Sequence, residues 1–141
     1  MIGEIVADNV FKLDNGQILS VRDLRGQVVV LNYWGTDCRA CDEQIKTLDY
    51  YYRQRKDVGL LVLVASIDDV NKTTLRKMVA GTELHAVRSV RGELADFGAI
   101  PSTYIIDRNG KVRYSADGVL DITQLNAVLV PLLRQPQPKD M

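Results

Sequence analysis

The stretch of residues 27–33 constrains the fold of this chain more than any other segment. It is rich in β-branched residues, and after Gln27 it has no polar residue before Asn32. This pattern is typical of a central strand that is covered on both faces, because a strand with one wet face alternates polar and apolar residues. The segment therefore predicts a domain in which a buried sheet lies between other layers.

The segments that follow predict alternating helices and strands. A long helix is expected from Arg39 to about Lys56, because this stretch has no Gly or Pro and begins with acidic residues in its first turn. Further strands are predicted at residues 59–67 and 85–89, a short helix at 73–79 and a helical turn at 92–97. A last helix is predicted after Asp121, where Gln124 completes a capping-box pattern, and Pro131 is expected to kink or end it.

Two hairpins complete the predicted sheet. Residues 10–13 and 17–21 flank the turn Asp14-Asn15-Gly16, and residues 102–106 and 111–115 flank a turn that ends in Asn109-Gly110. Asn-Gly pairs tolerate the positive φ of tight hairpin turns. The whole order indicates an α/β fold with a mixed central sheet, helices on both faces, and an N-terminal β-hairpin extension.

The length of 141 residues fits one domain with its own hydrophobic core. A domain of this size buries roughly 68–70% of the surface that its unfolded chain exposes, so it needs no disulfide framework or metal cluster to fold. Residues 135–141 are polar and include Pro136 and Pro138. We therefore expect a single domain over residues 1–134 and a flexible tail over residues 135–141.

Charge and hydropathy argue against two classes of partner. The chain has 18 Lys and Arg against 18 Asp and Glu, and this balance disfavours the basic surface that sequence-independent nucleic-acid binding requires. The longest mostly apolar run, residues 58–67, is about half of the ~20 residues that a membrane-spanning helix needs. Residues 1–8 show no secretory signal, which predicts a cytosolic protein or a mature or trimmed form. We expect neither nucleic-acid binding nor a membrane span.

Both cysteines of the chain stand in one short motif, Cys38-Arg39-Ala40-Cys41, directly after the predicted buried strand. Residues i and i+3 share one face of a helix, so the two sulfurs can close and reopen a disulfide with little backbone movement. The N-terminal end of a helix favours a thiolate, and Arg39 adds to this effect while Asp37 opposes it. We expect a lowered pKa for Cys38.

This geometry predicts different roles for the two thiols. Cys38 is expected to be the exposed sulfur that attacks a target disulfide, and Cys41 the shielded sulfur that resolves the mixed disulfide. A structural pair or half of a zinc site is the alternative. Zinc, however, requires four N or S ligands, and the chain has two Cys and one His. The motif therefore favours redox chemistry without a metal.

Three ordered segments carry a resemblance to a known family. Residues 33–41, from Tyr33 to Cys41, resemble the active-site segment of thioredoxin-like proteins, in particular the ResA, TlpA and DsbE group of extracytoplasmic bacterial thiol–disulfide oxidoreductases. Residues 10–32 and residues 100–110 match the same group, so the likeness covers most of the chain. The resemblance implies a thioredoxin-like fold.

The resemblance also implies supporting roles at the site. It places Pro101, after a cis peptide bond, beside the cysteines, and a cis bond is cheap only before proline. The backbone of Ile100 would then be free to pair with an incoming extended peptide. A simple turn proline is the alternative. Trp34 is expected to flank the site, to pack under the helix, or to do both.

Several positions depart from the family's usual residues. Asp37 stands where an aromatic residue is common, and Ala40 where proline is common, which leaves the direction of electron flow open. Gln44 replaces a glutamate of the ResA-like members, and Asn32 replaces the buried aspartate of thioredoxin. Neither amide titrates, so we expect no internal carboxylate to take the proton of Cys41.

The expected activity is exchange of electrons with protein cysteines through Cys38 and Cys41, with no bound cofactor. The resemblance implies reduction of partner proteins, including apocytochrome c, with an upstream protein as the electron donor. It also implies an extracytoplasmic location, with a signal or anchor that this chain lacks. We expect a monomer.

Two other functions are compatible with parts of the motif. The thiols could bind Cu(I) as soft ligands, with His85 as the only histidine available. The N-terminal half also resembles peroxiredoxins at a low level. Those enzymes need a Pro and a Thr at set spacing before the cysteine, whereas here Thr36 lies two residues away and no Pro precedes it.

Overall fold

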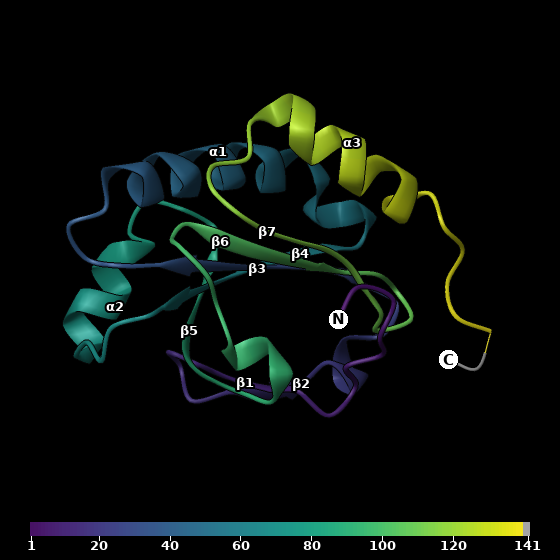
Figure 1. The fold of residues 1–141 in the computed structure, drawn as a ribbon, viewed down its shortest axis with the longest axis horizontal. Helices are drawn as coiled ribbons and strands as arrows, with labels where there is room; N and C mark the ends of the chain where they lie inside the picture. Colours follow the sequence, from purple (N-terminus) through teal and green to yellow (C-terminus); the bar gives the residue numbers. More distant parts are fainter. Residues whose placement is uncertain (140–141) are drawn as a thin grey trace.

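The computed structural model of the protein describes residues 1–139, and Asp140 and Met141 of the predicted tail lie outside it. Its described strands form one sheet in the order β2-β1-β5-β4-β3-β6-β7 (Figure 1). Strand β3 pairs in parallel with β4, and β4 with β5, while β6, β7, β1 and β2 add antiparallel pairs. The sheet is mixed, as predicted. Its strands are β1 (Val10–Leu13), β2 (Ile18–Ser20), β3 (Val28–Trp34), β4 (Leu60–Ser66), β5 (His85–Arg91), β6 (Ser102–Ile106) and β7 (Val112–Asp117).

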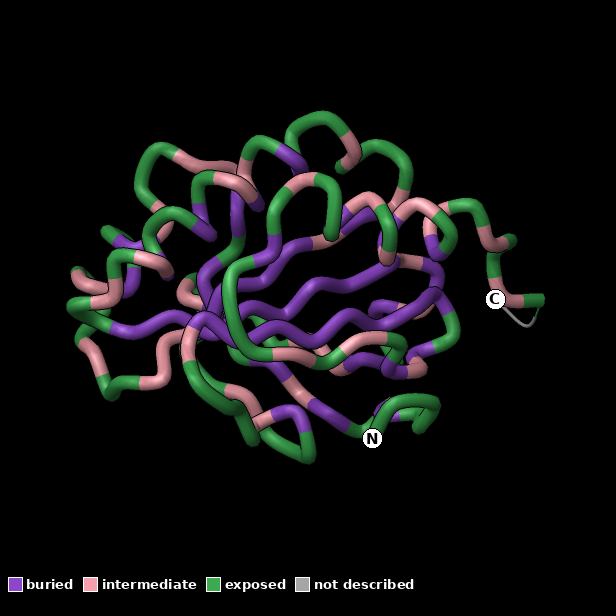
Figure 2. Tube along the Cα trace, turned by 45° about the horizontal axis from the view of Figure 1, so that its top comes forward, coloured by how far each residue is buried: buried purple, intermediate pink, exposed green. Residues whose placement is uncertain are grey.

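Strand β3 is buried along its whole length, as its apolar sequence predicts. Val28 and Val30 belong to the hydrophobic core on one side of the sheet. Val29, Leu31 and Tyr33 belong to the core on the other side. Figure 2 shows the strands as a continuous buried centre, with exposed residues mostly on the surrounding helices and loops. The strand therefore separates two cores by the alternation of its side chains.

All three described α-helices contribute to the same core. They are α1 (Arg39–Arg55), α2 (Lys72–Met78) and α3 (Ile122–Leu133). Helix α1 contributes Ile45 and Leu48 to this core, and α2 contributes Leu75. Helix α3 contributes Leu125 and Leu129. Helices α1 and α3 lie side by side above the sheet in Figure 1.

The opposite face differs from the prediction of helices on both sides. Within residues 1–139, it is covered by the N-terminal segment with Val6 and by the 3₁₀ helices η1 (Arg22–Leu24) and η3 (Glu93–Ala95), which bury Leu24 and Leu94. The connections that carry these turns are short and contain Gly26, Gly92 or Gly98. They therefore cover the sheet with single turns. A third 3₁₀ helix, η2 (Lys56–Val58), continues α1.

Three of the predicted local features concern the N-terminal hairpin and the last helix. Hairpin β1–β2 extends the sheet by pairing β1 with β5, which confirms the N-terminal extension. Asp121 and Gln124 form the predicted capping box at the start of α3. Pro131 does not end this helix, which continues to Leu133. Because Pro131 lies in the last turn, its missing N–H removes only one helical hydrogen bond.

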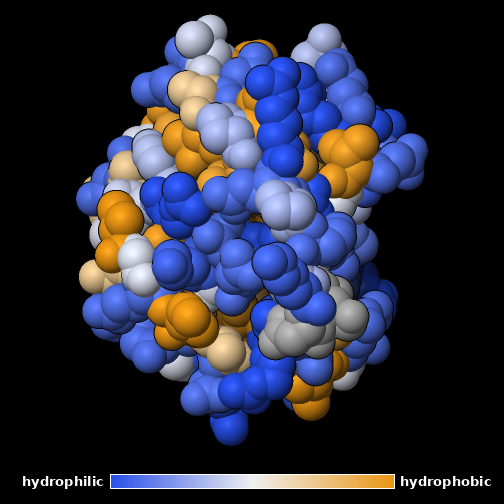
Figure 3. All heavy atoms as spheres, turned by 90° about the vertical axis from the view of Figure 1, so that its right-hand side faces the viewer, coloured by the Kyte–Doolittle hydropathy of each residue, from blue (hydrophilic) through white to orange (hydrophobic). Residues whose placement is uncertain are grey.

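The two ends of the sheet differ in character. Trp34 pairs with Ser66, and Tyr33 with Ser102, so the loops after β3, after β4 and before β6 meet at one end. This end lies at the left of Figure 1. The opposite end, seen in Figure 3, is predominantly hydrophilic and its apolar groups are separated from one another. No helix within residues 1–139 is long and apolar enough to cross a membrane.

Candidate redox site

The two cysteines form a disulfide at the start of α1. Their Cα atoms lie 5.2 Å apart. Cys38 is the N-cap residue, and its Sγ accepts a hydrogen bond from the backbone N–H of Cys41 at 3.1 Å. The first turn of a helix has backbone N–H groups without helical partners, and one of them here faces sulfur. The site therefore provides a hydrogen-bond donor and a helix N-terminus for a thiolate at Cys38.

The sulfurs differ in accessibility. Cys41 is 0% exposed and lies in the core between α1 and the sheet. Cys38 is half-buried at the edge of the same core. An external thiol or disulfide can therefore reach Cys38, while Cys41 is shielded.

Trp34 joins the end of β3 to the first turn of α1. Its side chain is 9% exposed and belongs to the core that contains Cys41. Its indole N–H donates to Asp42 Oδ1 at 3.1 Å. Trp34 thus packs under the helix and at the same time stands beside the cysteine segment.

The variable positions of the motif lie at the surface. Asp37 and Arg39 are exposed, and Ala40 is half-buried. Asp37 has φ of 57°, a left-handed conformation that Asp tolerates better than most residues. The chain thus makes a sharp turn directly before Cys38.

The loop before β6 packs against the loop before Cys38. The Ile100–Pro101 peptide bond is cis, and Pro101 is buried. A Cβ on Gly35 would lie 2.5 Å from Ile100 Cδ1 and 3.3 Å from Ile67 Cδ1, so a side chain at position 35 would displace the end of the Ile100 side chain. The carbonyl of Pro101 accepts from the N–H of Gly118 at 2.7 Å. The structure thus brings Ile100 beside the cysteine segment.

Two buried amides occupy the positions at which the resemblance leads one to look for acids. Gln44 Nε2 donates to the carbonyl of Leu120 at 2.9 Å, and the N–H of Leu120 donates to Gln44 Oε1 at 2.6 Å. Asn32 Nδ2 donates to Thr103 Oγ1 at 3.0 Å, while Asn32 Oδ1 is buried without a partner. Both positions are 0% exposed. Gln44 lies on α1, the redox helix that begins at the disulfide, and Asn32 lies on β3.

One residue of the site has no signal in the sequence. Asp68, in the loop after β4, accepts hydrogen bonds through Oδ2 from the N–H and from the hydroxyl of Thr36, each at 3.0 Å. The N–H bond, followed by the hydroxyl bond, lowers the pKa of Asp68 below its ordinary value. The partners lie 32 residues apart in the chain, so no local pattern could reveal the contact.

His85 lies away from the cysteines. Its Nε2 is 3.5 Å from the hydroxyl of Tyr52. Tyr52 is eleven residues beyond Cys41 on α1, or about 16 Å along a helix that rises 1.5 Å per residue. Within residues 1–139, no group of three or more His, Cys, Asp and Glu side chains is arranged to hold a metal ion. The structure therefore does not place His85 as a third ligand to the two thiols.

A mixed sheet, a helix that begins at a C-x-x-C disulfide and a neighbouring cis-proline loop together define a thioredoxin-like protein. More specifically, the chain belongs to the AhpC/TSA family, whose model matches residues 2–115.

Curated relatives carry the name thiol-disulfide oxidoreductase ResA. A protein of this name from Bacillus cereus is 29% identical over 108 residues, covering 69% of this chain and 58% of the relative. Another from Geobacillus thermodenitrificans is 26% identical over 124 residues, covering 84% of this chain and 71% of the relative. The chain thus spans 58% of the length of the Bacillus cereus relative and of a Bacillus thuringiensis relative.

Solved structures show the same fold. A proposed thiol:disulfide interchange protein DsbE from Chlorobium tepidum superposes with a TM-score of 0.79 at 22% identity, covering 94% of this chain and 98% of that one. StoA from Bacillus subtilis superposes with a TM-score of 0.69 at 17% identity, covering 89% and 99%. These similarities establish the architecture.

Proposed function

We propose that this protein is a thiol–disulfide oxidoreductase whose reactive groups are Cys38 and Cys41. The observation that carries the proposal is the disulfide between a half-buried N-cap sulfur and a fully buried sulfur one turn into α1. A purely structural disulfide has no need of an accessible sulfur at a helix N-terminus, where a thiolate is stabilised. The names of the relatives support the same activity.

The reaction passes through a mixed disulfide. The Cys38 thiolate attacks a disulfide of the partner, bonds to one partner sulfur, and releases the other, which takes up a proton. Cys41 then loses its proton and attacks Cys38, which restores the Cys38–Cys41 bond and releases the second partner thiol. Two electrons have passed to the partner. The reverse sequence oxidises a partner dithiol.

The residues around the disulfide receive supporting roles in this proposal. Ile100 packs on Gly35 beside the cysteine segment, and its backbone takes part in no strand pairing. It can therefore pair with an extended partner peptide. Pro101 and Trp34 hold the two sides of the site, and Asp37, Arg39 and Ala40 form its surface.

The proposed direction is reduction of partner proteins, such as apocytochrome c, in an extracytoplasmic compartment. An upstream protein re-reduces the disulfide, and no cofactor is bound. Support comes from the ResA-named relatives and from the resemblance of the cysteine segment. We propose that the protein acts as a monomer.

Insulin reduction with dithiothreitol as electron source tests the activity. Cys38→Ser should abolish turnover, whereas Cys41→Ser should still attack and should accumulate a mixed disulfide that can be trapped on a gel. Turnover by Cys38→Ser at the wild-type rate would refute the proposal. Tight stoichiometric Cu(I) binding without reversible disulfide closure would support a copper-binding function instead, and peroxide consumption would support a peroxidase.

The reduction potential tests the direction. Equilibration of the Cys38–Cys41 pair in glutathione or dithiothreitol buffers, followed by thiol trapping, gives the value. A potential near or below that of thioredoxin, about −270 mV, is expected for a reductant. A potential near that of DsbA, about −120 mV, would show an oxidant and would overturn the proposed direction.

A further inference from the structure

A carboxylate in the loop after β4 binds the redox loop, residues 35–38 between β3 and α1. Asp68 Oδ2 accepts from both the N–H and the hydroxyl of Thr36 at 3.0 Å. Thr36 stands two residues before Cys38, and Asp37 between them has the left-handed φ of 57°. The bonds to Asp68 therefore hold the chain immediately before its sharp turn into the helix.

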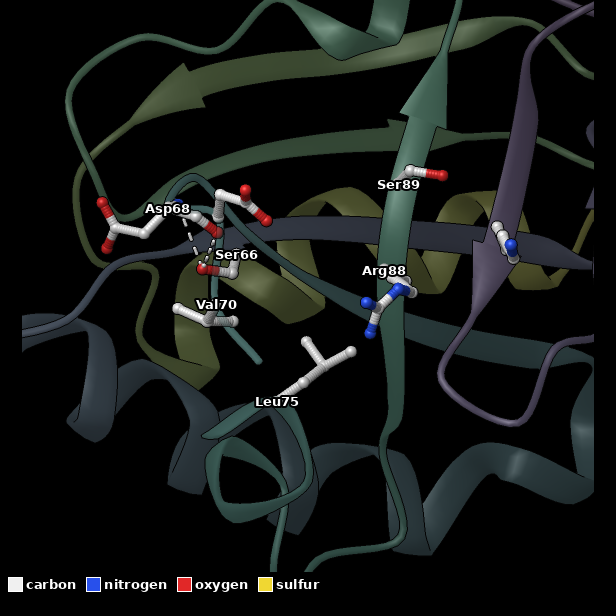
Figure 4. Close-up of a pocket in the computed structure, with 8 residues that line it drawn as sticks. Ser66, Asp68, Val70, Leu75, Arg88 and Ser89 are labelled. Atoms are coloured by element: carbon white, nitrogen blue, oxygen red, sulfur yellow. Dashed lines mark hydrogen bonds between the residues drawn. The ribbon is translucent and has the colours of Figure 1, made fainter. Parts of the chain in front are cut away.

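Asp68 is itself held in place by the sheet. Its N–H donates to Ser66 Oγ at 3.1 Å, and the Ser66 hydroxyl donates to the Asp68 carbonyl at 3.0 Å, as the dashed lines in Figure 4 show. Ser66 pairs with Trp34 across the β3–β4 ladder, and the N–H of Ile67 donates to the Trp34 carbonyl at 2.8 Å. A continuous series of bonds thus connects the central strands to Thr36.

The carboxylate has no competing cation. Figure 4 shows Asp68 at the edge of a cavity that Arg88 also lines. No Lys or Arg of residues 1–139 forms an ion pair with Asp68, and the lowered pKa of this group arises from Thr36 alone. A surface aspartate whose side-chain hydrogen bonds all go to the redox loop has a defined positional role.

We propose that Asp68 is a positioning residue for Cys38. By fixing Thr36, it sets the turn at Asp37 that presents the Cys38 sulfur to the N–H of Cys41. This inference rests on the proposed function in taking Cys38 as the attacking thiol. Loss of the anchor weakens the sulfur's hydrogen bond and its place at the helix N-terminus, and so raises the pKa of Cys38.

The charge of Asp68 and its anchoring of Thr36 have opposite effects on the pKa of Cys38. A carboxylate near Cys38 disfavours the thiolate by repulsion, whereas the anchored loop favours it. Position outweighs charge here, because Asp68 is exposed and its charge is screened by solvent. The charged side chains on the segments around Cys38 are Asp37, Arg39, Asp42 and Glu43 on its own loop and the start of its helix, Asp68 and Asp69 after β4, Arg88 on β5, and Asp96 and Asp117 near the Pro101 loop.

The test is the pH profile of iodoacetamide alkylation of Cys38 in the reduced protein. Asp68→Ala should raise the pKa of Cys38 by about half a unit, which slows alkylation roughly threefold at a fixed pH below the pKa. Thr36→Val keeps the Asp68 charge but loses the hydroxyl bond, and it should shift the pKa in the same direction by less. Thr36→Ser keeps both bonds and should restore the wild-type profile.

Asp69→Ala is the matched control, because Asp69 lines the same cavity and makes no hydrogen bond to the redox loop. It should leave the pKa of Cys38 unchanged or slightly lower. A lowered or unchanged pKa in Asp68→Ala, or in Thr36→Val with far-UV circular dichroism intact, would overturn the proposal. Alkylation of Cys38 needs no partner protein. The effect of Asp68 on the pKa of Cys38 can therefore be measured even if the protein does not reduce insulin.

Discussion

At the scale of single residues, two buried amides, Gln44 and Asn32, lie beside the redox site at positions where the family resemblance led us to look for acids. Gln44 satisfies both backbone groups of Leu120 from inside the core, across 76 residues of chain. An amide can donate and accept at once, which a carboxylate cannot do when it is ionised. Gln44 thus fixes the loop before α3 against the redox helix, and its amide does not titrate.

The variant Gln44→Glu tests this role. Burial raises the pKa of the new carboxyl in the folded protein above its unfolded value of about 4.3, so the folded state binds more protons than the unfolded state. Its stability should therefore be highest at low pH and should fall as the pH rises. We expect a loss of about 1–3 kcal/mol in the free energy of unfolding between pH 5 and pH 8, measured by urea titration.

The control for this prediction is Gln54→Glu, at an exposed position of the same helix. Its free energy of unfolding should change little over the same pH range. Equal pH dependence in the two variants would show that Gln44 is not as enclosed as its two bonds to Leu120 indicate.

At the scale of elements, one arginine joins three segments at the end of the sheet remote from the disulfide. Arg108, 5% exposed, donates through Nη1 to the carbonyl of Gly26. Through Nη2 it donates to the carbonyls of Val58 at 3.0 Å and Leu133 at 2.9 Å. Two of these carbonyls lie at the C-terminal ends of η2 and α3, where a positive charge is favourable.

Replacement of this side chain should be costly. Arg108→Met keeps much of the volume and leaves three carbonyls without their donor, so we expect a loss of about 2–5 kcal/mol in the free energy of unfolding. Arg91→Met, at an exposed position on β5, should change it by less than about 0.5 kcal/mol. Similar denaturant midpoints for the two variants would contradict the role given to Arg108.

The capping box at the start of α3 is expected to contribute less to the free energy of unfolding than Arg108 does. Asp121 accepts from the N–H of Gln124 at 2.8 Å, and Gln124 accepts in return from the N–H of Asp121 at 2.9 Å. Asp121→Ala should lower the free energy of unfolding by about 1 kcal/mol, whereas Asp121→Asn, which keeps the accepting oxygen, should lower it by less. Equal losses in the two variants would argue against the cap.

At the scale of the whole molecule, two cores on either side of β3 support the fold without help from the disulfide. Of the two cysteines of the disulfide, Cys41 is fully buried, and it is one member of a core formed by three helices and the sheet. The disulfide closes a loop with a sequence separation of 3, so it constrains little of the unfolded chain. A fold that does not depend on the disulfide is consistent with the proposed reaction, which opens this bond in every cycle.

We therefore expect the reduced protein to keep its architecture. Its far-UV circular dichroism spectrum should match that of the oxidised protein, and the Cys38→Ser/Cys41→Ser double variant should unfold cooperatively. Loss of helical signal on reduction would show that the redox helix depends on the disulfide.

Local patterns in the sequence determine the central strand, the helix that starts at Cys38 and the capping box of α3, because each depends on neighbours within a few residues. They also place both thiols on one helical turn. Tertiary structure alone decides the contacts that complete the site: Asp68 with Thr36, Gln44 with Leu120, and Ile100 with Gly35. It also decides that 3₁₀ turns cover the second face of the sheet. These contacts join segments far apart in the chain, and the pairing of the strands between them determines which segments meet.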